Sequence, residues 1–527
     1  MKRVMPDSGE SAAIDIQKII ATVEQQARTI ESLQHQLDWF KRQLFGKKSE
    51  RFVPPADPHQ MHLGELFDVA QVPAEHPAAT TDVPAHKRKR RQDNFAEDAG
   101  GTVPFFDRNK VPVITVEVPN EEARHLAPDQ YEVIGNKTTA RLAQRPGSWV
   151  VIEYVRQLIK RRDNGLLCCP PAPQGVLDSS RADVSFLAGL LVDKFQWHLP
   201  LYRQHQRLEA AGFKVSRPWL TQLVQQCAQL LEPVNQAQFD SILTSRLKAM
   251  DETPIKAGYA KPGSMKIGYF WPVYGELDEV CFPYFESREH AHVEHALGLN
   301  NVPGSVLLSD GYPAYERYTE KAGVEHANCW VHCRRKFFDA RNIEPDTVAE
   351  ALEIIGALYE IEEQIRGKAL KGKNKQMHRL SHSKPLVEKF FDWVDKKIAD
   401  QGFLPSNPIT TALAYAHKRR RALEVFLADP DVPMDTNHLE RALRPIAMGR
   451  RSWLFCSTEV GARYVGIIQG LIGTCRLHDI DPYTYLVDVL QRVGQHPAVR
   501  VAELTPRLWK EHFAAVPLRS DVDAART

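Results

Sequence analysis

Three acidic residues stand where they could form a site for divalent metal ions. Asp251 follows the run RLKAM, Asp310 follows SVLLS, and Glu440 lies in VPMDTNHLERALRPIAMGRRSWLFCS, which spans Val432 to Ser457. Magnesium and manganese prefer hard carboxylate oxygens, and two such ions about 3.5–4 Å apart promote phosphoryl transfer. If the fold brings them together, the sequence predicts DNA cleavage chemistry with two Mg²⁺ (or Mn²⁺) ions per site.

The segment around Glu440 predicts a helix from Asn437 to Met448, with Asn437 as its N-cap and a kink or break at Pro445. At 3.6 residues per turn, Asn437 shares a face with Glu440, where it could steady the carboxylate. We expect the arginines of the segment to hold DNA phosphates. They are Arg441, Arg444, Arg450 and Arg451. The alternative interpretation is a surface helix with a Glu–Arg pair.

The strands that would position the aspartates follow from the region 241–340. Three β-like runs, RLKAMDETPIKAG, GYFWPVYGE and EVCFPYFES, precede a helix and a fourth strand, GSVLLSDGYPAY. This order is typical of the start of an RNase H-like fold, a mixed sheet with flanking helices. In that topology the first and fourth strands are neighbours, so Asp251 and Asp310 would converge.

A helical insertion at 341–430 separates this first part of the core from the glutamate helix at 431–470. Its basic stretches, Lys368 to Lys375 and Lys418 to Arg421, are expected to be solvated. The chain then ends in a helical cap and tail at 471–527. The overall prediction is a multidomain α+β protein.

The region 181–240 predicts three helices that form a possible DNA-binding unit. The turn GFKVS, with Ser216 as N-cap and Pro218 near the first turn, has the spacing of a helix-turn-helix. Arg217, Trp219 and Gln222 would then lie where a recognition helix reads DNA. A three-helix packing unit without DNA contact explains the pattern equally well.

The region 105–180 predicts a small β-rich module ending near Cys168 and Cys169. A zinc ribbon needs two CxxC pairs, and no cysteine precedes these two. We therefore expect no zinc at Cys168 and Cys169.

The first 51 residues predict a coiled coil and hence a homo-oligomer, because apolar residues recur every seven positions from Ile16 to Leu44. Residues 52–104 resemble a flexible linker. A basic run within it either is solvated or neutralises DNA phosphates, and the sequence leaves both open. The run consists of Lys87, Arg88, Lys89, Arg90 and Arg91.

Composition fits an ordinary cytoplasmic protein. The chain has 527 residues, and its net charge of +2 means that DNA affinity must come from local patches. No apolar window approaches the length of a membrane span, and the N-terminus lacks a secretory signal. The 8 scattered cysteines indicate a reducing compartment.

Five ordered motifs resemble the DDE transposases of the insertion sequence 66 family. They are MDETP, SDGYPAY, CWVHCRRKF, TNHLERALRPIAMGRRSWLF and IDPYTYLVDVL, and the LFGKKSER end of the N-terminal helix resembles that family too. The resemblance implies an RNase H-like domain with an insertion, and two-metal strand cleavage and strand transfer. It also implies that the protein originates from a bacterial mobile element and is associated with the nucleoid when bound to DNA. It assigns the three acids to Asp251, Asp310 and Glu440.

From the residues alone, CWVHC is interpreted mainly as a packing segment, because only three potential ligands are visible and Cys and His suit zinc rather than magnesium. The resemblance further implies that Cys329 and His332 belong to a CxxH element. Accessory transposition proteins are a further implied partner. The sequence departs from the family in its missing cysteine pairs and in Thr436, which stands where an asparagine is usual. Two alternatives remain: a hydrolytic nuclease or resolvase, and a catalytically inactive, regulatory DNA-binding protein.

Overall fold

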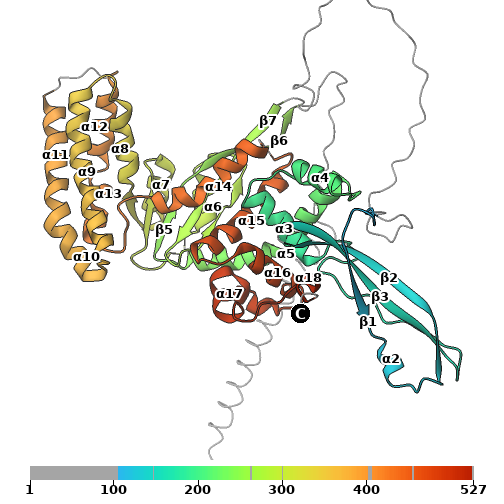
Figure 1. The fold of residues 1–527 in the computed structure, drawn as a ribbon. Helices are drawn as coiled ribbons and strands as arrows, with labels where there is room; N and C mark the ends of the chain where they lie inside the picture. Colours follow the sequence, from blue (N-terminus) through green and yellow to red (C-terminus); the bar gives the residue numbers. More distant parts are fainter. Residues whose placement is uncertain are drawn as a thin grey trace, which may run out of the picture.

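A computed structural model describes residues 105–524 apart from positions 146, 262–263, 300, 401–405 and 454–455. The predicted coiled coil and the basic run of the linker lie outside the described residues. The described chain is a mixed α/β structure with a central body, a long β ribbon and a bundle of helices on the opposite side (Figure 1). The predicted mixture of strands and helices is confirmed.

The central body is built on a five-stranded mixed sheet in the order β12-β11-β5-β8-β9. Strands β5, β11 and β12 are parallel, whereas β8 and β9 run antiparallel to their neighbours. The strands are β5 (Leu247–Met250), β8 (Val273–Gly275), β9 (Val280–Cys281), β11 (Val306–Ser309) and β12 (Glu325–Asn328).

Each of the three predicted runs is divided into two strands, so a second sheet continues beyond the first. This sheet has the order β10-β7-β6, with β6 (Thr253–Lys261), β7 (Ser264–Phe270) and β10 (Tyr284–Phe285). Pro272 and Pro283 stand at two of the breaks, where they lack the N–H that a continuous ladder requires. The third break falls at Asp251, which therefore lies at the boundary between the two sheets.

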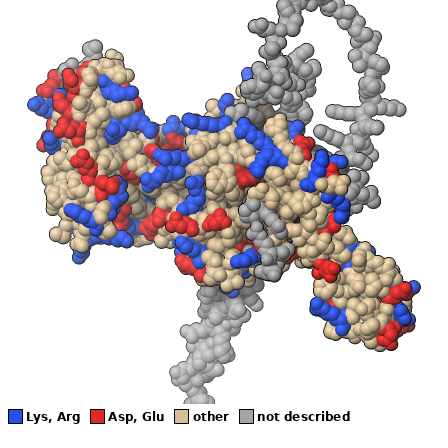
Figure 2. Space-filling view, viewed as in Figure 1, with Lys and Arg blue, Asp and Glu red and all other residues tan. Residues whose placement is uncertain are grey.

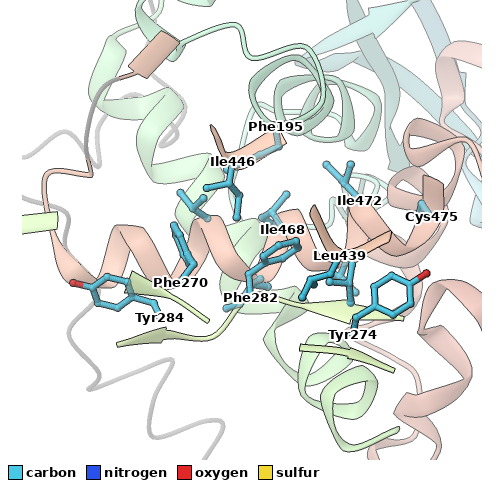
Figure 3. Packing of buried hydrophobic residues seen from close by; sticks show 14 of the residues in the cluster. Phe195, Phe270, Tyr274, Phe282, Tyr284, Leu439, Ile446, Ile468, Ile472 and Cys475 are labelled. Carbon is cyan, nitrogen blue, oxygen red and sulfur yellow. The ribbon is translucent and has the colours of Figure 1, made fainter. Parts of the chain in front are cut away.

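Helices cover both faces of the five-stranded sheet. Met250, Leu307 and Val273 pack with α6 (Ala291–Leu297) and α7 (Pro313–Ala322) on one face. On the other face Ala249, Leu308 and Tyr274 share a core with α14 (Asn437–Trp453) and α15 (Glu459–Leu477). Figure 3 shows Leu439 and Ile446 of α14 over Tyr274, Phe270 and Phe282, next to Ile468 and Ile472 of α15.

The remaining helices of the body include the three predicted ones, α3 (Val184–Phe195), α4 (Leu201–Ala210) and α5 (Arg217–Leu243). The Ser216 side chain caps α5 by accepting the Trp219 N–H, as expected. α5 continues through Pro233 and ends at Leu243. The C-terminal cap consists of α16 (Pro482–Arg492), a 3₁₀ helix (Ala498–Leu504), α17 (Pro506–His512) and α18 (Asp521–Ala524).

The β ribbon lies in the region predicted to form a small β-rich module. Its sheet has the order β1-β3-β2, with β4 also paired to β3, and a short helix α2 (Glu121–Arg124) follows β1. The strands are β1 (Val113–Val118), β2 (Tyr131–Arg145), β3 (Ser148–Arg161) and β4 (Leu167–Cys168). Cys168 and Cys169 are free, partly exposed thiols at the end of the ribbon.

The insertion forms a helical bundle with α8 (Figure 1). The predicted basic loop between its first helices is itself helical, because α10 continues into a short π-helix that leads to α11. The elements are α8 (Trp330–Asp339), α9 (Pro345–Gly367), α10 (Gly372–His378), the π-helix (Arg379–Ser383), α11 (Lys384–Ala399), α12 (Pro408–Lys418) and α13 (Arg420–Ala428).

Candidate active site

Asp251 and Asp310 extend from adjacent parallel strands. The register pairs Leu308 of β11 with Ala249 of β5, and each aspartate lies two residues further along its strand. Because side chains alternate along a strand, both aspartates continue the face that carries Ala249 and Leu308. This is the face on which α14 packs, so strand geometry directs both carboxylates toward the helix that carries Glu440.

Glu440 lies in the first turn of α14. Leu439 is fully buried and Ile446 is almost so, and burial of each side chain stabilises the docked helix by about 1.5–3 kcal/mol. Pro445 does not divide the helix, which runs beyond the predicted end to Trp453. Within the described chain, the Glu440 carboxylate has no hydrogen-bond or salt-bridge partner.

The three acids act on one another electrostatically. Burial raises the pKa of Asp251 to about 7, and the charges of Glu252, Asp310 and Glu440 contribute in the same direction. A hydrogen bond from the Glu252 N–H to Asp251 Oδ1, 2.8 Å long, opposes this rise because it favours the ionised carboxylate. Negative charges of several carboxylates therefore act on the largely buried Asp251, and a bound cation would reduce their repulsion.

Helix α8 brings His332 to the same acids. Burial lowers the pKa of the imidazole, whereas the charges of Asp310 and Glu440 raise it. Its Nδ1 atom is buried and has no hydrogen-bond partner in the described part of the chain. A buried polar atom without a partner is costly, so His332 is a candidate contact for a group that enters the site.

Cys329 has a different role. Its sulfur accepts hydrogen bonds from the backbone N–H and hydroxyl of Thr436, at 3.3 and 3.2 Å. Burial raises the pKa of this thiol to about 11, so it stays protonated near neutral pH. Because metals bind the thiolate, this geometry favours Cys329 as an anchor for the start of α14.

The start of α14 depends on Asp435, which sequence reasoning missed. Its carboxylate accepts the Asn437 backbone N–H at 3.0 Å and the Asn437 side-chain amide at 2.6 Å. Asn437 is therefore the first helical residue and not the N-cap that its residue type suggested. The amide is held by Asp435, and among the described residues it makes no hydrogen bond to Glu440.

The insertion fixes the loop before α14 through Arg379. This arginine is fully buried and forms a two-pronged ion pair with Glu362, with nitrogen–oxygen distances of 2.8 and 2.9 Å. Its remaining nitrogen donates to the carbonyls of Phe426 and Val432, at 2.8 and 2.9 Å. These contacts tie the insertion to the segment leading into Glu440. They come from a residue just beyond Lys368 to Lys375, the basic stretch that was expected to be solvated.

A second arginine of the insertion contacts the residue after Asp310. Arg419 donates to the Gly311 carbonyl at 2.8 Å and lies over the Tyr415 ring. A Cβ atom at Gly311 would come within 2.5 Å of Arg419 Nε and 2.6 Å of a Tyr415 ring carbon. Only glycine allows this close approach, so the insertion packs directly on the Asp310 turn.

Glu252, next to Asp251, is engaged by neighbouring side chains. It accepts hydrogen bonds from Arg288 Nε at 2.8 Å and from the Tyr315 hydroxyl at 2.6 Å. Arg288 in turn lies over the ring of Tyr312, and the backbone N–H of Tyr312 donates to Asp310. The Glu252–Arg288 pair therefore links the residue after Asp251 to the turn that holds Asp310.

The arginines of α14 separate into two groups. Arg441, Arg444 and Arg451 lie on one exposed stripe with Met448, and the described residues offer them no ion-pair partner. Arg450 instead donates to the Pro254 carbonyl of β6, and burial lowers its pKa. Figure 2 shows Lys and Arg side chains gathered over the face that carries α14.

The predicted recognition helix is only partly available. Arg217 is exposed and Gln222 is half-buried at the start of α5. Trp219 is buried and stacks on Phe186, with ring centroids 5.9 Å apart, so it belongs to the core. Trp453 is half-buried and has Lys194 Nζ 5.8 Å from its ring.

The carboxylates of Asp251, Asp310 and Glu440 suit a hard divalent cation by their chemistry, but they lie too far apart to coordinate one together. Among the described residues, no three His, Cys, Asp or Glu side chains lie close enough together to hold a metal ion as they stand. The carboxylates nevertheless share a face and raise the pKa of Asp251 through their charges. Metal binding would require them to move closer together.

Comparison with known proteins decides the family. The profile described as Transposase IS66 family matches residues 179–464, which include all three acids. The chain belongs to the IS66 family of transposases. The IS66 C-terminal element matches residues 470–507, and a profile described as Transposase C of IS166 homeodomain matches residues 32–98. Membership in the IS66 family indicates a transposase whose partner is DNA, and such families generally use divalent metal.

Three relatives from Sinorhizobium fredii match nearly the whole chain. Uncharacterized protein y4hP is 30% identical over 522 residues, covering 92% of this chain and 90% of the relative. Uncharacterized protein y4jD is 27% identical, covering 93% and 96%, and uncharacterized protein y4qI is 26% identical, covering 94% and 92%. None of the described helices is long and apolar enough to cross a membrane.

Proposed function

We propose that this protein catalyses metal-dependent cleavage of DNA at the ends of an insertion sequence and transfer of the cut strand to target DNA. The observation that carries the proposal is the placement of three carboxylates from separate elements: Asp251 and Asp310 lie two residues beyond a paired position of β5 and β11, on the sheet face against which α14 packs with Glu440 in its first turn. The sheet order β9-β8-β5-β11-β12, with its first three strands antiparallel, supports an RNase H-like core.

Asp251, Asp310 and Glu440 are the residues that would hold two Mg²⁺ or Mn²⁺ ions. When bound, these ions activate the attacking oxygen and stabilise charge on the phosphorus. The chain itself supplies the carboxylates, and His332 Nδ1 is a free buried nitrogen beside Asp310 and Glu440 that can contact a phosphate oxygen or a water molecule. Cys329 and Asp435 position Glu440 by fixing the start of α14.

Binding of the DNA backbone falls to exposed cations without acidic partners in the described chain. Arg441, Arg444 and Arg451 form a stripe on α14 that begins beside Glu440, so phosphates close to the scissile bond would lie along it. Arg217 and Gln222 at the start of α5 are the proposed base-reading residues. Lys87 to Arg91 remain a proposed tether, and the coiled coil remains the proposed contact for homo-oligomers.

The proposal is tested with purified full-length protein, labelled DNA carrying candidate element ends, and Mg²⁺, with and without accessory transposition proteins. Asp251→Asn, Asp310→Asn and Glu440→Gln should each abolish cleavage and strand transfer while leaving DNA binding largely intact. Glu289→Gln, which alters an exposed acid of the same domain, should leave both unchanged. Full activity in one of the three variants would remove that residue from the site.

Two other functions give different results in the same assay. Products released by water without joined DNA would indicate a hydrolytic nuclease or resolvase. Tight binding without cleavage under any metal condition would indicate a regulatory DNA-binding protein that has lost activity.

A further inference from the structure

Two large aromatic side chains are exposed where α3 meets α4. Trp197 is 66% exposed and Tyr202 is 53% exposed, on either side of Pro200. Single apolar residues on a surface are common and need no explanation. A tryptophan and a tyrosine close in sequence, both kept in water, are unusual because these residues contribute large apolar areas to cores and interfaces.

The side chains around this pair carry positive charge. The Arg217 guanidinium lies 5.4 Å from the centre of the Tyr202 ring, and Gln206 donates to the Tyr202 hydroxyl at 2.8 Å. Arg203 and Lys214 are also exposed, and neither has an ion-pair partner among the described residues.

Two acids of these helices have basic neighbours. Asp193 lies 3.7 Å from the Arg207 guanidinium, and Glu209 lies 3.2 Å from His205 Nδ1, an ion pair only when that imidazole is protonated. The surface therefore presents aromatic faces within an excess of uncompensated cations, a combination that suits nucleic acid better than an apolar protein partner.

The surface continues into the stripe of α14. Lys194, in the last turn of α3, lies with Nζ 5.8 Å from the ring of Trp453, the last residue of α14. At about 1.5 Å per residue, α14 rises about 20 Å between Glu440 and Trp453, the length of about six base pairs of B-DNA. DNA lying along the stripe would reach the α3–α4 corner about one half-turn of duplex from the acids.

We propose that Trp197 and Tyr202 form a stacking surface for unpaired bases of the DNA held along α14. Aromatic faces can stack only on bases that have left the duplex, whereas Arg203 and Lys214 bind the backbone beside them. The corner thus recognises an opened stretch of DNA about six base pairs from the cleavage point. This inference rests on the proposed function, because it takes DNA at the active site as given.

The test compares two labelled DNA probes that bind full-length protein without divalent metal. One is a fully paired duplex, and the other is the same duplex with a short run of unpaired bases about six base pairs from one end. The wild-type protein should bind the second probe more tightly. Trp197→Ala and Tyr202→Ala should remove this preference, each weakening binding to the second probe roughly tenfold.

A matched control uses Phe338, a 39% exposed ring on α8 that lies 3.9 Å from the Arg341 guanidinium. Phe338→Ala should leave both affinities unchanged, and Trp197→Phe should restore most of the preference. Equal loss on both probes would overturn base stacking. Unchanged DNA affinity with a change in oligomeric mass would overturn it in favour of contact with a second copy.

The two proposals fail in distinguishable ways. If wild-type protein binds neither probe and cleaves no DNA with Mg²⁺, the proposed function fails. If it binds and cleaves while Trp197→Ala and Tyr202→Ala behave as wild type, only the stacking surface is wrong.

Discussion

Arginines of the insertion and arginines of α14 lie near the same acids but in opposite environments. Arg379 and Arg419 point inward and donate to backbone carbonyls, one at Val432 before α14 and one at Gly311 after Asp310. Arg441, Arg444 and Arg451 point into solvent and have no ion-pair partner among the described residues. The first group fixes the elements that carry the acids, and the second is available to a ligand.

This difference between the two groups of arginines indicates that the insertion is part of the proposed site and does not merely separate two parts of the core. A buried guanidinium group is costly unless its N–H donors find acceptors, so loss of its partners destabilises the fold. Exposed arginines contribute little to stability and much to phosphate binding. Substitutions in the two groups should therefore separate stability from DNA affinity.

Arg379→Met should have the largest effect on stability. It leaves the Glu362 carboxylate and the Phe426 and Val432 carbonyls without their donor, and we expect the free energy of unfolding to fall by about 3–5 kcal/mol. Chemical denaturation measures this change. Arg366→Met breaks a surface pair with Glu363 on the neighbouring turn of α9 and should cost about 0–1 kcal/mol. Equal losses in both variants would mean that Arg379 is no anchor.

Gly311→Ala should come next. The new Cβ would meet Arg419 and Tyr415, and such overpacking costs about 1–3 kcal/mol. Because the residue follows Asp310, cleavage should fall more than DNA affinity, which binding and cleavage assays measure separately. Gly356→Ala in α9 meets no atom within 4 Å and should be neutral or slightly stabilising. A variant at Gly311 with wild-type cleavage would show that Asp310 tolerates displacement of its turn.

Sequence patterns predicted local structure well where one period dominated. The apolar alternation of β3 and the helical periodicity of α3 and α9 are local signals, and those elements are present. The division of each core strand into two was not predicted, because no glycine or proline stands between β5 and β6, and only Pro272 and Pro283 marked breaks in the others. β2 was missed because YEVIGNKTTARLAQR is largely polar, and its pairing with β3 is what makes it a strand.

The site divides in the same way. The catalytic roles of Asp251, Asp310 and Glu440 stay predictions, but the shared face of the two aspartates was predictable from strand order, since residues at the ends of adjacent parallel strands lie side by side. The roles of Arg379, Arg419 and Asp435 were not predictable, because they consist of contacts across the sequence or of competition for a cap. Basic stretches usually are solvated, and only the tertiary structure separates Arg379 and Arg419 from the lysines beside them.

Thr436→Val should have a smaller effect than either of the first two changes. It removes the hydroxyl that donates to Cys329 Sγ, while the Thr436 backbone N–H still donates, so the expected loss of stability is about 1 kcal/mol. Denaturation measures it, with Thr221→Val in the exposed start of α5 as control. If Cys329 instead binds metal, Cys329→Ser should remove bound zinc from the purified protein, and that result would contradict the anchor.

Arg444→Ala and Arg451→Ala should leave stability unchanged within about 0.5 kcal/mol, because both side chains are exposed and unpaired in the described chain. Each removes one phosphate contact if DNA lies along α14. The affinity should then fall to a similar degree for DNA of any sequence, and the slope of log affinity against log salt should decrease by about one per arginine. Lys396→Ala, an exposed cation of α11, should change neither quantity. Loss of an anchoring arginine would lower stability and leave the salt slope unchanged. If the variant at Arg444 or Arg451 behaves in that way, the arginine is an anchor like Arg379, and the DNA does not lie along α14.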